Sequence, residues 1–279
     1  MSVEYGDLLD YPLRGDDTVT VFAVMAGVPV VLAIVSVVIA FLSLLIPFLG
    51  ILNLVLYPVG LLVGVLWLGY FVRIVRSTYA GETKPPALDD WGGLLKDGLF
   101  GTVVYLVYSI PLFVLVGVGF VAFVGLVGGA GALAEESAGA ALGLLGILVF
   151  LVISVLYLAY AVVMSYFAPV SICSYADDRS LSAAFSVDRL RRVALTTDYA
   201  VPWALVAGAA FAIQMIVGFL TAFLVGYLLQ PLVPIAYFFL GVGSFYLFAQ
   251  VYDERVRTSA PESRAPADDR SGAGRRRTR

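Results

Sequence analysis

The sequence predicts an all-α integral membrane protein, a six-helix bundle built as three helical hairpins. Two observations predict this fold class. Ala, Val, Ile, Leu, Met, Phe, Trp, Tyr and Cys make up 61% of the 279 residues, and the mean hydropathy is +0.97, whereas soluble domains are roughly 45–50% apolar. Six apolar stretches also exceed the ~18 residues that indicate a spanning helix. They cover residues 18–46, 50–72, 99–128, 139–168, 200–229 and 231–251.

The positions of the basic residues predict the orientation of these spans. All seventeen Lys and Arg residues lie in four of the seven segments outside the spans: the N-terminal segment, the connections after the second and fourth spans, and the C-terminal segment. Cytoplasmic segments of membrane proteins retain Lys and Arg. We therefore expect a multi-pass protein of the cell membrane with both termini in the cytoplasm and with short outer connections.

Three regions follow from this topology. Residues 1–17 form a cytoplasmic N-terminal segment, residues 18–252 form the transmembrane domain, and residues 253–279 form a cytoplasmic tail. The tail is rich in Ser, Ala, Pro, Asp and Arg. Because it has too few apolar residues to build a core, it is predicted to be disordered.

Aspartates recur where spans begin on the inner side. Asp16 and Asp17 precede the first span, Asp97 the third and Asp198 the fifth. A carboxylate at such a position accepts hydrogen bonds from the free N–H groups of the helix N-terminus and suits its positive dipole end. We expect structural capping rather than catalysis at these four residues.

The two inner connections each predict a short interfacial amphipathic helix on the inner face. In the first, residues 91–99 place Trp and Leu side chains on one helix face, after Asp89 or Asp90 as the cap. In the second, a similar stripe begins at Leu181 and then drifts, because Asp188 interrupts it.

Both inner connections are entered through the same spacing of aromatic and small residues. Tyr70-Phe71 is followed by Tyr79-Ala80, and Tyr166-Phe167 is followed by Tyr175-Ala176. This match indicates either a parallel repeat of the helical hairpin or a chance pairing of residues that are common at membrane exits. The sequence leaves both interpretations open.

Two blocks of the inner segments resemble a known family. Residues 11–17 read Tyr-Pro-Leu-Arg-Gly-Asp-Asp, and residues 85–91 read Pro-Pro-Ala-Leu-Asp-Asp-Trp. Together with a third stretch at 184–199, they resemble archaeal membrane proteins, common in haloarchaea, that carry domain of unknown function 4013. The resemblance covers residues 8–252, with Leu88 where that family has an aromatic. It implies the membrane fold and an archaeal source, but no activity.

A candidate interaction surface lies on the inner side. In the block at 85–91, two carboxylates beside a Trp could bind a cation or a basic segment of a partner; they could equally cap a helix and anchor it at the lipid headgroups. Nearby arginines could pair with these acids across the inner face. The candidate surface consists of Arg14, Asp16, Asp17, Arg73, Arg76, Asp89, Asp90, Trp91 and Asp97.

Within the spans, Asn53 and Gln214 are the most polar side chains. They are candidates for a solute site, although interhelical packing also uses such residues at about 0.6 kcal/mol per hydrogen bond. Glycine pairs with the spacing that favours close helix contact occur at Gly60/Gly64, Gly125/Gly129 and Gly139/Gly143.

The sequence lacks the residues that several classes of reaction require. The chain has no His, a single cysteine (Cys173), and no Asp, Glu, Lys or Arg deep in a span. Ser–His catalysis, the common zinc motifs and intramembrane proton relays depend on those groups. We therefore expect no enzyme activity, no cofactor, no metal and no nucleic-acid partner.

The leading hypothesis is a non-enzymatic membrane component that organises partners or lipid at the inner leaflet, with the bilayer and a membrane or cytoplasmic protein as partners. The first alternative is a transporter or channel for a neutral or lipid-like solute, with a polar cavity lined by Asn53 or Gln214. The second is a membrane enzyme that uses a cytoplasmic carboxylate cluster at Asp89, Asp90 and Asp97.

Overall fold

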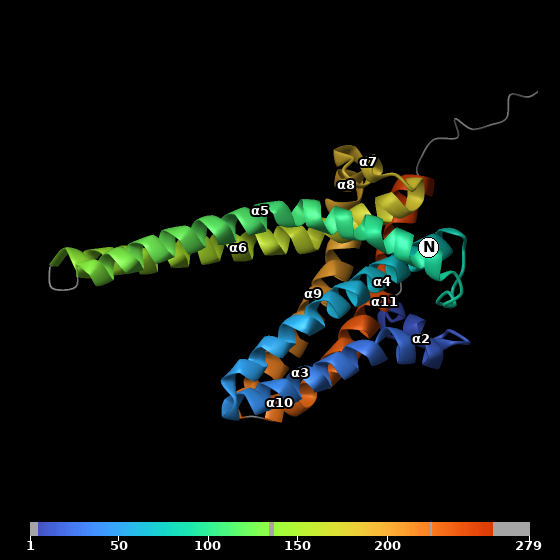
Figure 1. Ribbon diagram of the computed structural model, residues 1–279. Coiled ribbons are helices and arrows are strands. Elements are labelled where there is room, and N and C mark those ends of the chain that lie inside the picture. The colour runs from blue at the N-terminus through green and yellow to red at the C-terminus, as the bar shows by residue number, and fades with distance from the viewer. Residues whose placement is uncertain (1–4, 134–136, 224, 259–279) are drawn as a thin grey trace, which may run out of the picture.

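The computed structural model describes residues 5–133, 137–223 and 225–258, and these form helices without strands (Figure 1). Six helical segments are long and apolar enough to cross a membrane, which confirms the predicted fold class. In chain order the helices are α1 (Asp7–Asp10), η1 (Tyr11–Leu13), α2 (Thr18–Met25), α3 (Gly27–Leu45), η2 (Pro47–Leu52), α4 (Asn53–Tyr79), α5 (Trp91–Ala132), α6 (Ser137–Asp178), α7 (Leu181–Ala184), α8 (Val187–Ala194), α9 (Thr197–Thr221), α10 (Val225–Leu229), η3 (Gln230–Leu232), α11 (Val233–Tyr252) and η4 (Asp253–Thr258).

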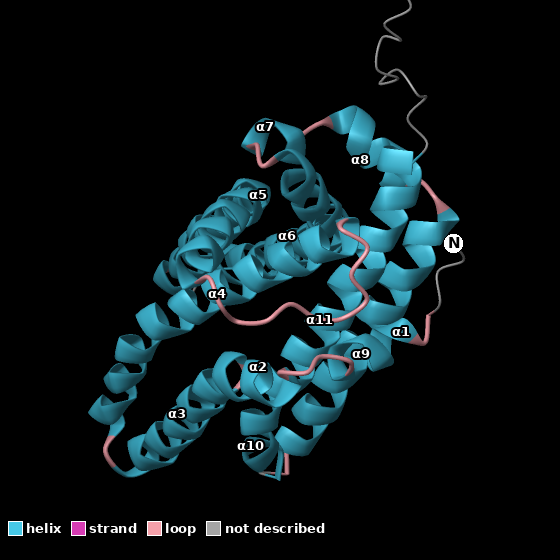
Figure 2. Cartoon of the chain, turned by 90° about the vertical axis from the view of Figure 1, so that its right-hand side faces the viewer, coloured by secondary structure: helices cyan, strands magenta, loops and turns pink. Residues whose placement is uncertain are grey.

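The molecule has two arms that meet at one end (Figure 1). One arm is the α5–α6 hairpin, and the other contains α3, α4, α9, α10 and α11. The meeting end carries α1, α7, α8 and η4, together with every ion pair formed by the described residues. We call it the charged end, and the opposite end, with η2 and η3, the turn end. Figure 2 looks onto the charged end.

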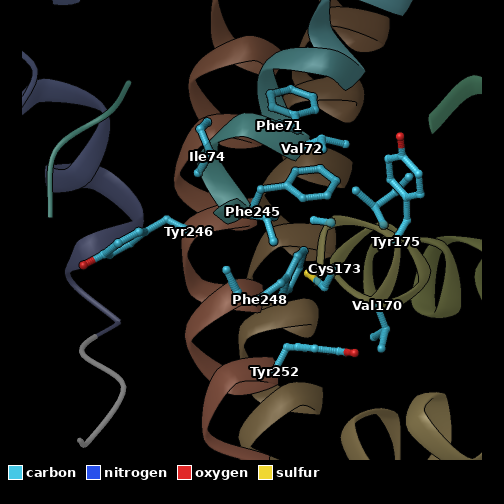
Figure 3. Packing of buried hydrophobic residues seen from close by; sticks show 14 of the residues in the cluster. Phe71, Val72, Ile74, Val170, Cys173, Tyr175, Phe245, Tyr246, Phe248 and Tyr252 are labelled. Atoms are coloured by element: carbon cyan, nitrogen blue, oxygen red, sulfur yellow. The ribbon is translucent and has the colours of Figure 1, made fainter. Parts of the chain in front are cut away.

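The hydrophobic core lies at the charged end, around α11. In the span that contains α11, 56% of the most apolar 18-residue window is buried, compared with 0–6% in the other five spans. Phe71 of α4 stacks on Phe245 of α11 with ring centroids 4.8 Å apart, and Tyr11 of η1 stacks on Tyr246 at 3.8 Å (Figure 3). Buried aromatic pairs of this kind add about 0.5–1.5 kcal/mol each beyond the area they bury. α11 is therefore the central helix of the fold.

The first span is divided into α2 and α3 by a break at Ala26. Pro29 has no N–H, so the carbonyl of Met25 loses the donor that would close the next helical turn. The indole Nε1 of Trp67 in α4 donates to that carbonyl at 2.7 Å. Within a bundle, neighbouring helices re-satisfy backbone groups that a proline frees. The break is therefore stabilised by α4.

One of the two predicted interfacial helices does not exist as a separate element. α5 begins at Trp91 and continues without a break to Ala132. No proline interrupts residues 91–110, and Pro111 is accommodated inside the helix. The amphipathic stripe at 91–99 is therefore the first part of a spanning helix. The second inner connection does form short helices, α7 and α8.

The first part of the predicted tail is helical. Residues Asp253–Thr258 continue α11 as η4, a wider helical turn, because Arg257 is held there by contacts described below. The rest of the predicted tail, 259–279, lies outside the described residues, as do Glu135 and Glu136.

The closest helix contact uses glycines that the spacing pattern did not single out. A Cβ on Gly69 of α4 would lie 2.0 Å from the carbonyl oxygen of Leu94, and one on Gly98 of α5 would lie 1.9 Å from that of Val65. Only glycine permits such an approach of two backbones. Gly60 and Gly64, the predicted pair in α4, instead face open space.

Candidate functional site

Arg73 of α4 holds the connection between α4 and α5. Its Nη1 donates to the carbonyl of Ala87 at 3.0 Å and to Oδ1 of Asp89 at 2.8 Å, and its Nη2 donates to the carbonyl of Asp90 at 2.6 Å. Backbone N–H groups of Asp90 and of Asp89 itself, with the Arg73 charge, lower the pKa of the Asp89 carboxyl. Tyr70 adds a hydrogen bond from its hydroxyl to a carbonyl of the same connection, at 3.0 Å.

Asp90 has a different role, as the cap of α5. Its Oδ1 accepts a hydrogen bond from the N–H of Gly93 at 2.9 Å. Substitution of such a cap by Ala typically costs about 1 kcal/mol. The two adjacent aspartates therefore have different roles: Asp89 binds Arg73, and Asp90 caps the N-terminus of α5. Trp91, the next residue, is 47% exposed.

A second arginine of α4 joins three helices. Arg76 forms an ion pair with Asp97 of α5, and its Nε donates to the carbonyl of Ala176 in α6 at 3.3 Å. The hydroxyl of Tyr175 donates to Asp97 at 3.3 Å, and the Arg76 guanidinium lies over the Tyr175 ring, 5.7 Å from its centroid. Both charged side chains are only about one-fifth exposed, and Arg76 Nη2 is buried without a hydrogen-bond partner.

The N-terminal segment is attached to the same end by charges and one buried ring. Arg14 pairs with Asp7, and Lys84 Nζ lies 3.0 Å from Oδ1 of Asp16. The hydroxyl of Tyr11 donates to the carbonyl of Lys84 at 3.3 Å, while its ring is fully buried. The block at 11–17 thus fixes the N-terminal segment to the α4–α5 connection.

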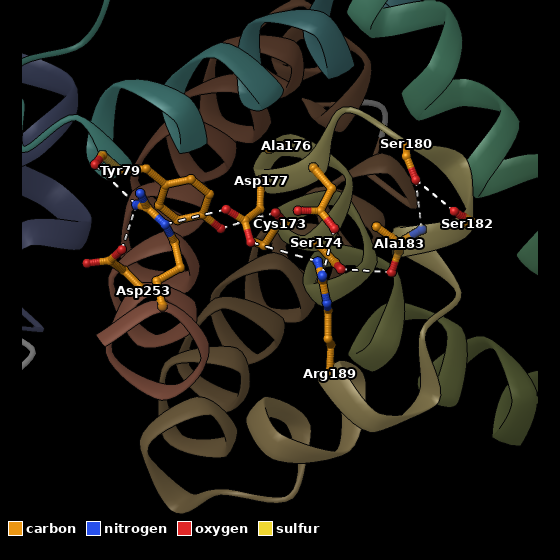
Figure 4. Close-up of polar contacts among 12 residues, drawn as sticks. Tyr79, Cys173, Ser174, Ala176, Asp177, Ser180, Ser182, Ala183, Arg189 and Asp253 are labelled. Carbon is orange, nitrogen blue, oxygen red and sulfur yellow. Dashed lines mark hydrogen bonds and ion pairs between the residues drawn. The ribbon is translucent and has the colours of Figure 1, made fainter. Parts of the chain in front are cut away.

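A further ion-pair group joins α8 to the end of α6 (Figure 4). Arg189 Nη2 lies 2.6 Å from Oδ2 of Asp178, and Arg189 Nη1 lies 3.8 Å from Oδ2 of Asp177. The hydrogen bond that Arg189 donates to Asp178 raises the pKa of Arg189. Below these charges, the hydroxyl of Ser174 donates to the carbonyl of Ala183 at 2.8 Å. α7 and α8 are therefore fixed to α6.

Arg257 of η4 contacts two other elements. Arg257 Nη1 donates to Asp253 at 2.7 Å and to the carbonyl of Tyr79 at 3.1 Å. Its Nε lies 3.4 Å from Oδ1 of Asp177, and its guanidinium lies over the Tyr79 ring, 4.7 Å from the centroid. These contacts connect the end of α11 with the ends of α4 and α6.

Not all basic residues of the charged end are used in this way. Arg179, Arg191 and Arg192 are exposed and form no ion pair with another described residue. On α8, the exposed side chains of Val187 and Leu195 lie at i and i+8 around Arg191 at i+4, while Leu190 faces the core. We call the exposed set Val187, Asp188, Arg191, Arg192 and Leu195 the α8 face.

The predicted inner residues do lie at the charged end, but they form separate contacts rather than one cluster. Arg14 pairs with Asp7, which the sequence reading did not consider, and Asp17 stands at the start of α2 without making a side-chain cap bond. The groups are Arg14 with Asp7, Asp16 with Lys84, Arg73 with Asp89, Arg76 with Asp97, Asp90 with Gly93, and Asp198 with Arg255.

The two predicted intramembrane residues lie apart from each other. Asn53 lines a cavity of about 670 Å³ between α3, α4 and α10, and its Oδ1 is buried without a hydrogen-bond partner. Gln214 is exposed on α9 and does not line that cavity. A polar cavity that involves Asn53 is therefore present, and it lies toward the turn end.

The sequence reading missed the contacts of Asp177, Asp178, Arg189 and Arg257. The two adjacent aspartates follow a long apolar helix, and Arg189 follows eleven residues later on a separate helix. No helical periodicity connects residues across such a turn, so only the folded arrangement shows that they meet. The described residues contain no group of three His, Cys, Asp or Glu side chains that could hold a metal ion.

Most of the helices described above match a known protein family. The profile described as "Protein of unknown function (DUF4013)" matches residues 54–222, which is more than half of the chain and runs from α4 to α9. The match includes both arginines of α4, the Pro-Pro-Ala-Leu-Asp-Asp-Trp block and α8. No curated protein and no solved structure matches the chain. The chain belongs to the DUF4013 family, whose function is unknown.

Proposed function

We propose that the protein is a non-enzymatic, multi-pass membrane component that organises lipid or protein partners at the inner leaflet. The enrichment of Lys and Arg in the segments of the charged end supports a cytoplasmic position for that end. The observation that carries the proposal is the α8 face, where Arg191 and Arg192 form no ion pair with another described residue, whereas Arg189 and Arg257 are engaged in ion pairs.

The α8 face combines the two properties that retain anionic lipid. Exposed Val187 and Leu195 supply apolar contact, at 57% and 74% exposure, and basic residues beside an apolar stripe are typical of interfacial helices. Each Lys or Arg near an anionic surface contributes about 1 kcal/mol. Because Arg189 fixes α8 to α6, this face is presented on a rigid support.

The test compares a double variant with a charge control. We expect Arg191→Gln with Arg192→Gln to weaken binding of short-chain phosphatidylglycerol to the detergent-solubilised chain by about thirtyfold, from ~1 kcal/mol per arginine. Lys96→Gln, which removes an exposed charge on α5, should leave binding nearly unchanged. Short-chain phosphatidylcholine measures the contribution of the apolar contact alone. Pull-down from mild detergent tests for a protein partner. Equal binding of both lipids by all variants, together with no protein recovered by the pull-down, contradicts the proposal.

A second candidate function is transport of a neutral or lipid-like solute. The cavity beside Asn53 favours it, because a polar, uncharged site within the membrane is what such a transporter requires. Solute flux into proteoliposomes, compared between wild type and Asn53→Leu, tests this candidate. The enzyme alternative has no comparable support, since Asp89, Asp90 and Asp97 are each engaged in a different contact.

A further inference from the structure

Two cavities between α3 and α4 form one continuous groove. The cavity at Asn53, of about 670 Å³, and a second of about 360 Å³ share Leu32 and Gly60 in their walls. Each volume falls in the ~300–1,000 Å³ range of ligand pockets. The groove begins beside α10 and η3 at the turn end and runs along α4 to Trp67, where α11 forms its other wall. Figure 1 shows how the helices α3, α4, α10 and α11 are arranged.

The groove follows one face of each of the two helices, α3 and α4. The lining residues of α4 lie on a single helix face, and so do those of α3. From Asn53 to Trp67 the groove follows α4 over 14 residues, or about 21 Å at 1.5 Å per residue. Gly60 and Gly64 form its floor, and a Cβ on either would meet nothing within 4 Å. The α4 lining residues are Asn53, Leu56, Tyr57, Gly60, Leu61, Val63, Gly64 and Trp67.

The polarity of the groove changes along its length. The part near the turn end is lined by polar residues, namely Asn53, Tyr57, Tyr227 and Gln230. Farther along, the lining is mainly Leu, Val, Pro and Gly. The lining contains no Asp, Glu, Lys or Arg. Such a site suits an uncharged head and an apolar chain.

Asn53 supplies the most specific requirement. Its carbonyl oxygen Oδ1 is buried and accepts no hydrogen bond from the described residues. Oδ1 itself is closed off from the groove, so a ligand hydroxyl at the head of the groove meets Asn53 through its amide NH2 group, which forms no hydrogen bond with a described residue. A ligand hydroxyl oxygen can accept a hydrogen bond from this group.

We propose that this groove binds one membrane lipid with an uncharged, hydroxyl-bearing head, which hydrogen-bonds with Asn53 and extends its chain toward Trp67. The site lies at the end opposite the α8 face and goes beyond the proposed inner-leaflet role. An anionic lipid is disfavoured there, because the groove offers no cation.

Monooleoylglycerol serves as the probe and methyl oleate, which has the same chain but no hydroxyl, as its comparison. Native mass spectrometry of the full chain in mild detergent should show one saturable monooleoylglycerol per chain. Gly60→Leu and Gly64→Leu fill the groove and should each weaken binding at least tenfold. Gly117→Leu is the matched control, because a Cβ at Gly117 of α5 also meets nothing within 4 Å; it should bind as wild type.

Asn53→Leu separates the head from the chain. It should weaken monooleoylglycerol binding about fivefold, the equivalent of one hydrogen bond of ~1 kcal/mol, and leave methyl oleate binding unchanged. Arg191→Gln should affect neither probe. Binding that the Gly60, Gly64 and Asn53 substitutions all leave at the wild-type level overturns the proposal, as does binding of many copies without saturation.

Discussion

Ion pairs at the charged end differ in burial, and at the residue scale burial decides what each contributes. Asp97 and Arg76 are about one-fifth exposed, whereas Asp16 and Lys84 are 85% and 59% exposed. Breaking a fully buried pair costs about 3–5 kcal/mol because one charge remains unpaired. Exposed pairs contribute about 0–1 kcal/mol.

We therefore expect Asp97→Asn to destabilise the protein by about 2–3 kcal/mol, somewhat less than a fully buried pair, since Arg76 would lose its carboxylate. Asp16→Asn serves as the control and should cost less than about 1 kcal/mol. Thermal unfolding in detergent, followed by circular dichroism, compares the two. Similar melting temperatures for both variants would show that Arg76 finds another partner or water.

Asp89 predicts a specific dependence on pH. Its folded-state pKa lies below the ordinary value of 3.8, because backbone N–H groups and Arg73 favour the carboxylate. The folded state therefore binds this proton less readily than the unfolded state, so the contribution to stability is present above about pH 4–5 and is lost as the pH falls through the folded pKa. Asp89→Asn should flatten the acid limb of the stability curve below about pH 5. A stability curve that stays parallel to the curve of the wild type argues against a stabilising contact between Arg73 and Asp89.

Residue types predicted these roles only in part. An aspartate before a span predicts a cap, and Asp90 confirms it at α5. The same prediction is wrong for Asp16, Asp17, Asp97 and Asp198, which make no cap bond; all but Asp17 form ion pairs instead. Helix-start preference is a local property, whereas the choice of an arginine partner depends on how α4 and α5 pack.

At the scale of elements, two prolines are each compensated by a tryptophan from another helix. Trp67 donates to the carbonyl of Met25, which Pro29 leaves without a donor. In α6, Pro169 removes the donor for the carbonyl of Ser165, and Nε1 of Trp203 in α9 donates to that oxygen at 3.0 Å. In both cases, the proline of one helix is matched by a tryptophan of the neighbouring helix, whose indole N–H binds the freed carbonyl.

This pairing predicts a rescue. Trp67→Phe leaves the Met25 carbonyl unsatisfied and should destabilise the protein by about 1–3 kcal/mol. Pro29→Ala restores a backbone N–H at that position, so the double variant should be more stable than Trp67→Phe alone. Thermal unfolding of the four proteins of this double-mutant cycle measures the coupling. Additive effects would contradict the pairing.

Helix existence was predictable because each span needs only a long apolar run. Helix length was not: α5 and α6 each contain 42 residues, about 63 Å at 1.5 Å per residue, against a hydrocarbon core of ~30 Å. The amphipathic first turns of α5 looked like a separate element because their periodicity differs from the uniformly apolar part. The periodicity of apolar residues shows which face of a helix is buried, but it does not show where the helix ends.

At the scale of the whole molecule, the six spans and the all-helical class were predictable, and the two-arm arrangement was not. The predicted glycine pair at Gly60 and Gly64 is open, while Gly69 and Gly98 bring α4 and α5 into contact. Spacing alone identifies faces that permit close packing, but the choice among them depends on the whole bundle. The archaeal source that the resemblance implies, and the cytoplasmic side of the charged end, stay predictions.

The place of α11 as the central helix has a consequence for biosynthesis. Chains are made from the N-terminus and fold progressively as they emerge. Here the helix that gathers the buried aromatic rings is the last of the six spans to leave the ribosome. The five earlier spans therefore enter the bilayer before their common centre exists. A premature stop before Val233 would leave hairpins that are inserted but unassembled, a form that membrane quality control would recognise by its exposed charged helix ends.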